Sequence, residues 1–425
     1  LLTAACTQIP ERESWYPPVR EITETPVLSP EESLDSLIVP PNFRVELAAA
    51  EPLVEDPIAI DIDPGGRMWV VEMRGFMTDL VDESGDYRPV GRVKVLEDAD
   101  NDGRMDRQTV FLDSLVLPRS VLVLRDGVLV GEPPHLWLAR DTTGDLRADT
   151  KTAVREDYGT RMGNPEGMVN SPVWGMDNWI HNTRYPLRFR RDGDFWVADT
   201  TLRLGDWGLS MDNVGRFYRN WNSDPLRVEL VPSHYYARNE DMLDQSAPAV
   251  RIAEEAQEVW PIRTTRGVNR GYRQHTLRAD GTLRTVTAAG SPVVYRGDRY
   301  PAEFQGDVFI AEPAGNLVRR FKIIEGSNGT MEAVNAYNRA EFMASTDERF
   351  RPVNLYSGPD GTLYVIDMYR GVIEHRNFLT QYLRDHVEKR GLETPLGLGR
   401  IYRVVHESIP RRETDPHLSD ASDQA

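Results

Sequence analysis

One short pattern, a strand followed by a tight glycine turn and a second strand, occurs near both ends of the chain. Residues 57–73 align without gaps on residues 352–368, and the two turns read Gly-Gly and Asp-Gly. Apolar residues alternate with a period of two on both sides of each turn, as in a β-hairpin, and glycine supplies the positive φ that a two-residue turn needs. The pattern therefore predicts repeated β units.

Four weaker copies of the same pattern lie between these two. They cover residues 121–131, 173–181, 207–218 and 304–312. Six sheet-like copies with no helical stretch between them predict an all-β chain, a six-bladed β-propeller in which each copy is one blade. About 80 residues separate the fourth and fifth copies, so the blades must carry long insertions there. An array of sandwiches is the structural alternative.

Both ends of the repeat region are strand-like. Pairing residues 43–47 with residues 400–405 in one blade would close the ring and remove its open edges. We therefore assign residues 41–405 to the propeller. The only helix that the sequence predicts convincingly covers residues 377–390. Residues 406–425 are polar and are predicted to be a tail, or a linker to a further C-terminal region.

The charge balance narrows the classes of partner. The chain has 425 residues, with 50 Lys and Arg against 67 Asp and Glu, which gives a formal net charge of −17. Such an acidic chain repels phosphate backbones and anionic lipid, so no nucleic-acid partner is expected. With 40% hydrophobic and 28% charged residues, and no apolar stretch near the length of a membrane span, the composition is typical of a soluble globular protein.

The single cysteine, Cys6, excludes disulfides, cysteine-based zinc sites and attached c-type haem within this chain. Small residues directly before it resemble a bacterial lipoprotein signal, whose cysteine carries the lipid. An ordinary thiol is the alternative. Residues 7–40 are rich in Pro, Glu and Ser, so we interpret residues 1–40 as a signal remnant and an extended tether. The expected location is the bacterial cell envelope, periplasmic or at the surface, with contact to a membrane only through the lipid on Cys6.

An acidic loop carries the clearest local chemistry. Asp98, Asp100 and Asp102 occupy alternate positions ahead of Gly103, between two strand-like segments. This arrangement lets a short loop fold around one Ca²⁺, and we predict that ion here. The loop lacks the closing Glu of an EF-hand, and a solvated Asp-rich turn is the alternative. A second acidic loop, residues 141–149, is expected to be a turn without metal.

Polar residues that end the repeats are the candidates for a functional site, because propeller sites form where the innermost strands meet the central channel. Arginine, carboxylate and amide side chains there suit a hydroxyl-rich or anionic ligand. The candidates are Glu72, Arg74, Asn182, Arg184, Arg219, Asn220, Glu312, Asp367 and Arg370. Glu72, Arg74, Asp367 and Arg370 are expected to converge on one end of the channel. Mutual ion pairs that seal the channel are the alternative explanation. His181 is the histidine best placed to act as a base.

Several motifs, taken in order, resemble a known family. They are Trp-Gly-Met-Asp-Asn-Trp-Ile at 174–180, Trp-Gly-Leu-Ser-Met-Asp-Asn-Val-Gly-Arg at 207–216, Glu-Pro-Ala-Gly-Asn-Leu-Val at 312–318, and Phe-Arg-Pro-Val-Asn-Leu at 350–355 with Gly-Pro-Asp-Gly at 358–361. These look like the propeller of the membrane-bound dehydrogenases related to soluble glucose and sorbosone dehydrogenases. The likeness covers about residues 40–405.

This resemblance implies a six-bladed propeller that binds pyrroloquinoline quinone (PQQ) beside Ca²⁺ and oxidises a sugar, aldehyde or alcohol. Long members of the family continue into helical repeats and a cytochrome c domain. The resemblance therefore also implies a cytochrome c as electron acceptor, in the same polypeptide or separate, and a chain that continues past Ala425. The carboxylates of the quinone need cationic partners, and Arg219 and Arg351 are predicted to supply them.

The sequence departs from the family at one position. Glucose dehydrogenases carry a His ahead of the third-blade motif as the catalytic base, whereas this chain has Gly167 in the segment Asn-Pro-Glu-Gly-Met-Val-Asn at 164–170. Gly167 cannot accept a proton. The predicted catalytic groups are therefore Glu72, His181 and Asp367, with Glu166 as a further candidate.

Three functions remain open from the sequence. The first is a quinone-dependent dehydrogenase that passes electrons to a cytochrome c. The second is a calcium-containing propeller that hydrolyses or cleaves a carbohydrate or lactone with a metal-bound water. The third is a non-catalytic surface lipoprotein that binds glycans or scaffolds a complex. Redox activity with an artificial acceptor, after addition of PQQ and Ca²⁺, separates the first from the other two.

Overall fold

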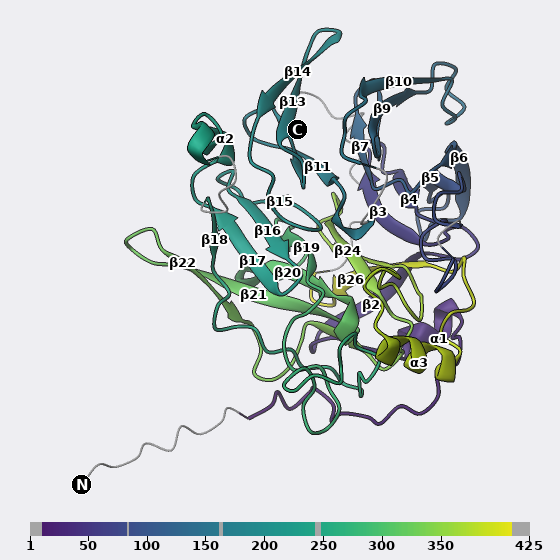
Figure 1. The fold of residues 1–425 in the computed structure, drawn as a ribbon, viewed down its shortest axis with the longest axis vertical. Coiled ribbons are helices and arrows are strands. Elements are labelled where there is room, and N and C mark those ends of the chain that lie inside the picture. Colours follow the sequence, from purple (N-terminus) through teal and green to yellow (C-terminus); the bar gives the residue numbers. More distant parts are fainter. Residues whose placement is uncertain (1–10, 83–84, 161–164, 243–247, 410–425) are drawn as a thin grey trace.

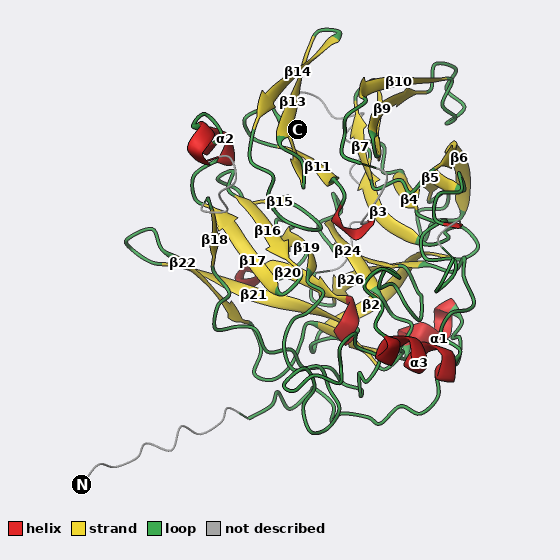
Figure 2. Cartoon of the chain, viewed as in Figure 1, coloured by secondary structure: helices red, strands yellow, loops and turns green. Residues whose placement is uncertain are grey.

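The computed structural model describes residues 11–82, 85–160, 165–242 and 248–409. Strands dominate this range, and its α-helices are the short α1 (Pro30–Leu34), α2 (Ser233–Tyr236) and α3 (Gln381–Arg390). Figure 2 shows how little of the chain is helical. Six antiparallel sheets follow one another around a ring (Figure 1). The chain is thus a six-bladed β-propeller, which confirms the predicted fold class.

Each blade consists mainly of consecutive strands. Blades 1 and 2 are β3 (Pro57–Ile62), β4 (Met68–Glu72), β5 (Gly91–Glu97), β6 (Arg107–Leu115), and β7 (Ser120–Leu124), β8 (Gly127–Glu132), β9 (His135–Arg140), β10 (Thr150–Arg155). Blades 3 and 4 are β11 (Asn170–Trp174), β12 (Ile180–Thr183), β13 (Leu187–Asp192), β14 (Phe195–Thr200), and β15 (Ser210–Met211), β16 (Phe217–Trp221), β17 (Asp224–Glu229), β18 (Ala249–Arg251). Blade 5 contains β19 (Gly290–Val294), β20 (Val308–Glu312), β21 (Leu317–Glu325), β22 (Met331–Asn335), β23 (Met343–Ser345) and β1 (Leu37–Ile38).

The sixth blade closes the ring. It combines β24 (Pro352–Ser357), β25 (Leu363–Asp367) and β26 (Arg400–His406) with β2 (Phe43–Ala50) from the start of the chain. The strands β2 and β26 pair in antiparallel register from Phe43 opposite His406 to Ala50 opposite Arg400. This pairing confirms the predicted closure, and it joins the two ends of the repeat region in one sheet.

The first strand of each blade lines the central channel. β24 contacts both β3 and β19, and β7 contacts both β3 and β11. Between blades 3 and 4 the side chain of Asn170 links the inner strand of blade 3 to the segment before the inner strand of blade 4. It donates to the carbonyl of Asp206 (2.8 Å) and accepts from the amide of Gly208 (3.1 Å). The pairing register shifts where β3, β11, β19 and β24 begin, next to a proline in each case. Proline cannot donate a ladder hydrogen bond, so it is tolerated at such irregular strand starts.

Two details differ from the sequence prediction. In the fifth copy, residues expected to form the first strand are a 3₁₀ turn, Ala302–Phe304, and the inner strand is β19 instead. The reason is a loop whose ends are bonded together: Tyr295 donates its amide to Asp307, and Gly306 donates to Tyr295. The predicted helix 377–390 begins only at Gln381, because the side chain of Thr380 caps it.

The N-terminal segment lies against the propeller. Tyr16 is buried in a core cluster with residues of blades 4 and 5, and β1 pairs with β23. Cys6 and residues 410–425 lie outside the described residues, so the lipid anchor and the tail stay predictions. In the part of the chain that the structure describes, no helix has the length and apolarity needed to span a membrane.

The apolar cores lie between adjacent blades. One cluster joins blades 1 and 2 through Trp69, Val71, Val128 and Val130, and another joins blades 5 and 6. Both faces of a blade are therefore buried against its neighbours, and the ends of the channel are left to polar residues and loops.

Candidate functional site

A cavity of about 220 Å³ lies at one end of the central channel. Every blade contributes a residue at the start of its inner strand or in the segment just before it. These residues are Ile58, Arg119, Glu166, Trp207, Gly290 and Val353. Because all six inner strands start at the same end of the ring, side chains that are far apart in sequence meet there.

The rest of the wall comes from loops that follow the second strands and from two insertions. Met73, Phe76 and Met368 supply apolar surface, and Asn222 supplies an amide. Residues 252–289, between blades 4 and 5, contribute Val268, Asn269 and Arg270, whereas residues 368–399, inside blade 6, contribute Ile373 and Glu374. Asn269 joins the two insertions, since it donates to the carbonyl of Phe378 (2.9 Å) and accepts from the hydroxyl of Thr380 (2.8 Å). The predicted long insertions thus complete the cavity.

Three acidic residues line this cavity: Glu166, Asp206 and Glu374. Asp206 pairs with Arg184 and accepts the amide of Asn222 (2.9 Å), so Glu166 and Glu374 are the two that remain as candidates for chemistry. Glu166 lies in a 3₁₀ turn, Pro165–Gly167, just before β11, and its Oε1 accepts the amide of His375 at 2.5 Å. Burial, and after it the neighbouring Glu374, raise the pKa of Glu166 to about 7, against the opposite effects of the His375 amide and Arg119. Burial also raises the pKa of Glu374, against a hydrogen bond from Asn269. A carboxyl group that is half ionised near neutral pH suits proton transfer.

The buried cation of the cavity is Arg119, directly before β7. Its backbone amide donates to the carbonyl of Gly131 at 2.7 Å, which fixes the residue at the mouth of the channel. The side chain is only 2% exposed, its Nη2 lies 3.5 Å from the sulfur of Met168, and its Nε has no acceptor among the described residues. Burial lowers the pKa of Arg119 to about 10, with Glu166 opposing the shift. The guanidinium therefore stays charged at neutral pH.

The carboxylates that end the second strands bind backbone amides instead of lining the cavity. Each accepts a backbone amide from the segment that leads into the inner strand of its own blade. The bonds run from Glu55 to Glu72 (2.8 Å), from Val116 to Glu132 (2.7 Å), from Ala288 to Glu312 (3.1 Å) and from Arg351 to Asp367 (2.8 Å). Glu132 was not singled out from the sequence, although it ends the second strand of blade 2 in the same way. These groups fix the connections between blades, and none of them lines the cavity.

These strand-end carboxylates are deeply buried. Glu72 forms an ion pair with Lys94 at 2.8 Å, and burial raises its pKa. Burial likewise raises the pKa of Glu312 and of Asp367 to about 7. Their neighbours Met73, Pro313 and Met368 do reach the cavity, so the second strands end at the predicted end of the channel. The side chains of Glu72 and Asp367, however, are directed to backbone amides.

The candidate arginines have partners inside the fold. Arg219 pairs with Glu229 (2.5 Å), Arg370 with Asp56 (2.7 Å), Arg74 with Glu55 (2.7 Å) and Arg184 with Asp206. Arg351 donates to the backbone carbonyls of Pro313 (2.8 Å), Arg370 (3.2 Å) and Gly371 (2.7 Å). None of the five lines the cavity. The four ion pairs match the alternative weighed from the sequence, in which charges at the channel pair with one another, whereas Arg351 is held by backbone carbonyls.

The remaining candidates are also engaged away from the cavity. Asn220 donates to the carbonyl of Ala289 (2.5 Å), and Asn182 accepts from the hydroxyl of Tyr158 (2.6 Å). His181 is buried beside the turn of the first hairpin of blade 3, where its Nε2 lies 3.1 Å from Asp177. Among the candidate bases named from the sequence, Glu166 is the one that lines the cavity.

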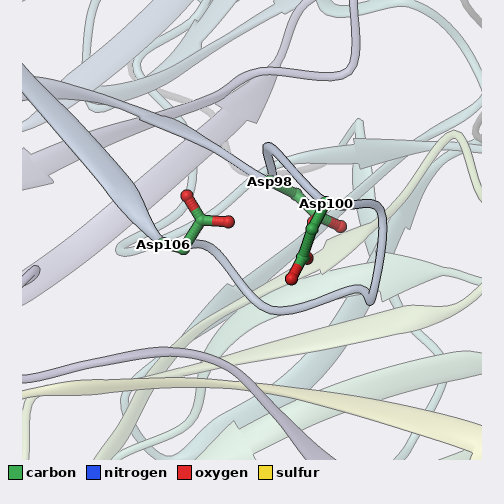
Figure 3. A group of neighbouring side chains, drawn as sticks. All are labelled: Asp98, Asp100 and Asp106. Atoms are coloured by element: carbon green, nitrogen blue, oxygen red, sulfur yellow. The ribbon is translucent and has the colours of Figure 1, made fainter.

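The acidic loop joins β5 and β6. Carboxylate oxygens of Asp98, Asp100 and Asp106 lie within 4.8 Å of one another there (Figure 3). The sequence prediction had Asp102 in place of Asp106, but the carboxylate of Asp102 accepts the amide of Arg104 at 2.7 Å. Asp98 accepts the amide of Gly103 (2.7 Å), which folds the loop. The calcium ion stays a prediction, with Asp106 added to its candidate ligands.

Comparisons with known proteins give a family. The model of a family described as a domain of unknown function (DUF7133) matches residues 29–408. No curated protein matches the sequence. Solved structures that share the overall architecture include the holo form of the pyranose dehydrogenase PQQ domain from Coprinopsis cinerea, with 13% identity over 87% of this chain and 97% of that chain and a TM-score of 0.47.

Two further solved structures match at similar identity and coverage. A glucose dehydrogenase matches with 13% identity over 84% of this chain and 98% of that chain, with a TM-score of 0.45. The calcium structure of a Trichoderma reesei carbohydrate-active enzyme of family AA12 matches with 10% identity over 87% of this chain and 97% of that chain, with a TM-score of 0.47. At such identities the likeness concerns the fold alone.

Proposed function

The chain belongs to the family described as a domain of unknown function (DUF7133), and we propose that it is an oxidoreductase that oxidises a sugar, aldehyde or alcohol in the channel cavity with a PQQ-like quinone. The observation that carries the proposal is the meeting of Glu166, Glu374 and the buried cation Arg119 in one cavity with apolar walls. A proton acceptor, a second carboxyl group and a fixed positive charge are the parts that oxidation of a hydroxyl compound needs.

The residues of the cavity fit a planar anionic cofactor. Met73, Phe76 and Met368 offer apolar surface to a ring, and Arg119, whose Nε has no acceptor among the described residues, offers a guanidinium to an anionic oxygen. Arg270 is a second cation in the wall. A bound quinone would supply the acceptor for the two electrons that leave the substrate.

The protein's own groups would handle the proton. Glu166, with its pKa raised to about 7 mainly by burial, would accept the proton of a substrate hydroxyl as the carbon–hydrogen bond is oxidised. Glu374 keeps this proton affinity high by its like charge. Asn222 would present its amide to the remaining hydroxyls, and the apolar wall limits the access of water.

The electron acceptor and the location are proposals that rest on the sequence resemblance alone. We propose that a cytochrome c accepts the electrons and that a lipid on Cys6 holds the protein at the bacterial cell envelope. Mass spectrometry of the native N-terminus would detect the lipid. Reduction of added cytochrome c during turnover would detect the acceptor. An unmodified Cys6 would refute the anchor, and turnover without cytochrome reduction would refute the acceptor.

A carbohydrate hydrolase or lyase is the second candidate. Acid–base cleavage of a glycoside or lactone also requires two carboxyl groups in one cavity, and Glu166 and Glu374 provide them. The pKa of Glu166, about 7, suits the role of the acid. This reaction needs no quinone. Product formation from carbohydrates and lactones without PQQ or an electron acceptor would favour it over the oxidoreductase.

Calorimetry and dye reduction test the proposed function together. Wild type should bind PQQ in the presence of Ca²⁺ and reduce an artificial acceptor with at least one member of a sugar and alcohol panel. Glu166→Gln should keep PQQ binding and lose turnover, whereas Arg147→Ala, an exposed residue of the loop between β9 and β10, should change neither. If wild type neither binds PQQ nor reduces the acceptor, the oxidoreductase proposal is rejected.

A further inference from the structure

The most deeply buried arginines differ in how their charge is partnered. Among the described residues, five arginine side chains are almost completely inaccessible to solvent, namely Arg119, Arg219, Arg319, Arg370 and Arg400. Four of them form ion pairs: Arg219 with Glu229 (2.5 Å), Arg319 with Glu341 (3.4 Å), Arg370 with Asp56 (2.7 Å) and Arg400 with Glu51 (3.0 Å). Within the described residues, no carboxylate lies within ion-pair distance of Arg119, the one member of this group that lines the cavity.

An unpaired buried guanidinium is expensive to maintain. Its five N–H donors lose water on burial, and only acceptors within the protein or on a ligand compensate for that loss. The hydrogen bond that Arg119 makes within the described residues is to the thioether of Met168 at 3.5 Å, and sulfur is a weak acceptor. Burial lowers the pKa of Arg119 only to about 10, and the charge of Glu166 acts on that pKa in the opposite direction, so the guanidinium stays charged. A partner is therefore missing on the cavity side.

We propose that Arg119 binds the carboxylate of a polyhydroxylated organic acid, such as a sugar acid, or the carboxylate of the quinone cofactor. This inference rests on the proposed function for the identity of the cavity as the active site. A guanidinium fork matches a carboxylate with two parallel hydrogen bonds, which no neutral hydroxyl can do.

The other polar groups of the cavity fit the remainder of such a ligand. Glu166 and Glu374 can accept hydrogen bonds from hydroxyls, and the side-chain amide of Asn222 can both donate and accept. A ligand with one carboxylate at Arg119 and several hydroxyls would satisfy both kinds of group. Glu166 does not prevent anion binding, because a carboxyl group with a pKa near 7 takes up a proton when a second negative charge approaches.

Binding measurements by calorimetry test the site and separate the two sources of the carboxylate. The probes are gluconate, its neutral analogue glucose, and PQQ with Ca²⁺, each titrated into wild type, Arg119→Met and the exposed control Arg147→Ala. If the source is the substrate, Arg119→Met should weaken gluconate about ten- to a hundred-fold and leave glucose unchanged. If the source is the cofactor, the same loss should appear for PQQ and not for gluconate. Unchanged affinity for both carboxylates would overturn the inference.

Thermal unfolding provides an independent measurement that needs no ligand. Arg119→Met leaves no carboxylate without a partner, so it should unfold at or above the temperature of wild type, whereas Arg219→Met should unfold well below because it strands Glu229. Destabilisation of Arg119→Met as large as that of Arg219→Met would assign Arg119 a structural role and overturn the inference. Dye reduction by wild type keeps the two proposals apart. No redox activity, with an affinity for gluconate or PQQ that depends on Arg119, rejects the oxidoreductase alone. Redox activity, with affinities for both carboxylates that do not depend on Arg119, rejects the site alone.

Discussion

Two regions at the same end of this propeller contain buried charges, yet they differ in how those charges are partnered. At the ends of the second strands, Glu72, Glu132, Glu312 and Asp367 each accept a backbone amide from a connecting segment. In the cavity Glu166 also accepts a backbone amide, that of His375, but the charge of Glu374 adds to burial in raising its pKa. Arg119 there has a thioether as its hydrogen-bond partner among the described residues. For the arginines, the difference teaches that the presence of a charged partner, rather than burial or residue type, separates a structural charge from a candidate functional one.

The strand-end region also repeats from blade to blade, whereas the cavity does not. A carboxylate at the end of a second strand recurs in blades 1, 2, 5 and 6. Arg119, Glu166 and Glu374 each occur once, and Glu374 comes from an insertion rather than from the repeat. A side chain that recurs at the same place in several blades stabilises the fold, whereas a side chain that departs from the repeat is available to bind a ligand.

The largest expected effect is on stability, from the strand-end region. Arg370→Met removes the partner of Asp56, which is buried and held by an ion pair of 2.7 Å. We expect the free energy of unfolding to fall by about 3 to 5 kcal/mol, because an uncompensated buried carboxylate is left behind. Urea denaturation of wild type, Arg370→Met and Arg119→Met compares the two regions directly. If the free energy of unfolding falls equally in the two variants, Arg119 and Arg370 do not differ in structural role.

The second expected effect is on catalysis, from the cavity. Glu166→Gln should lower kcat of the proposed reaction about 10²- to 10⁴-fold while ligand binding persists, because an amide cannot accept the proton. In wild type kcat/KM should rise with pH through about 7, since Glu166 must be ionised to act as a base and burial holds its pKa there. Asp367→Asn, a change in the strand-end region, should keep this pH profile. If Asp367→Asn loses the pH dependence of kcat/KM and Glu166→Gln keeps it, then Asp367 and not Glu166 is the catalytic base.

A smaller effect links stability to pH in the strand-end region. Burial raises the pKa of Asp367 to about 7 in the folded protein, above the value of about 3.9 for an exposed aspartate. The folded state therefore binds this proton more tightly, so the contribution to stability is full below about pH 4 and is lost as pH rises through about 7.

Asp367→Asn should reduce this loss by roughly 2 kcal/mol, because the amide oxygen keeps the bonds from the amides of Arg351 and Tyr369 (both 2.8 Å) and does not titrate. Urea midpoints of both proteins at pH 5 and pH 7.5 measure the difference. A pH dependence that is the same in both proteins would mean that Asp367 is ionised over the whole range.

The smallest expected effect concerns the acidic loop, outside both regions. If Ca²⁺ binds there, millimolar Ca²⁺ should stabilise wild type by about 1 to 3 kcal/mol, as saturation of a site on the folded state does. Asp106→Asn should abolish the gain, and Asp102→Asn should keep it, because Asp106 and not Asp102 belongs to the observed cluster. If Asp102→Asn and not Asp106→Asn abolishes the stabilisation, the ligands are those predicted from the sequence. If Ca²⁺ does not stabilise wild type, the loop is an Asp-rich turn without metal.

Much of the fold was predictable because it depends on local pattern. Period-two alternation and glycine turns identified the hairpins, and the strand-like ends identified the closing pair β2 and β26. The fifth hairpin was misplaced because a loop of several residues separates its strands, and loop length does not follow from strand pattern. The acidic loop was located correctly, but the choice of Asp106 over Asp102 depends on how the loop turns.

The sequence by itself determined the all-β repeat, its number of blades, its closure and the end of the channel at which the second strands finish. Only the tertiary structure decided which charges have partners. Arg370 meets Asp56 across the closure of the ring, and Arg119 meets no carboxylate at ion-pair distance within the described residues, although both are arginines next to a predicted strand. Strand pattern is set by neighbours two residues apart, whereas ion pairs and cavities are set by contacts between blades. Glu166 was within reach of the sequence through its motif, and Arg119 was not.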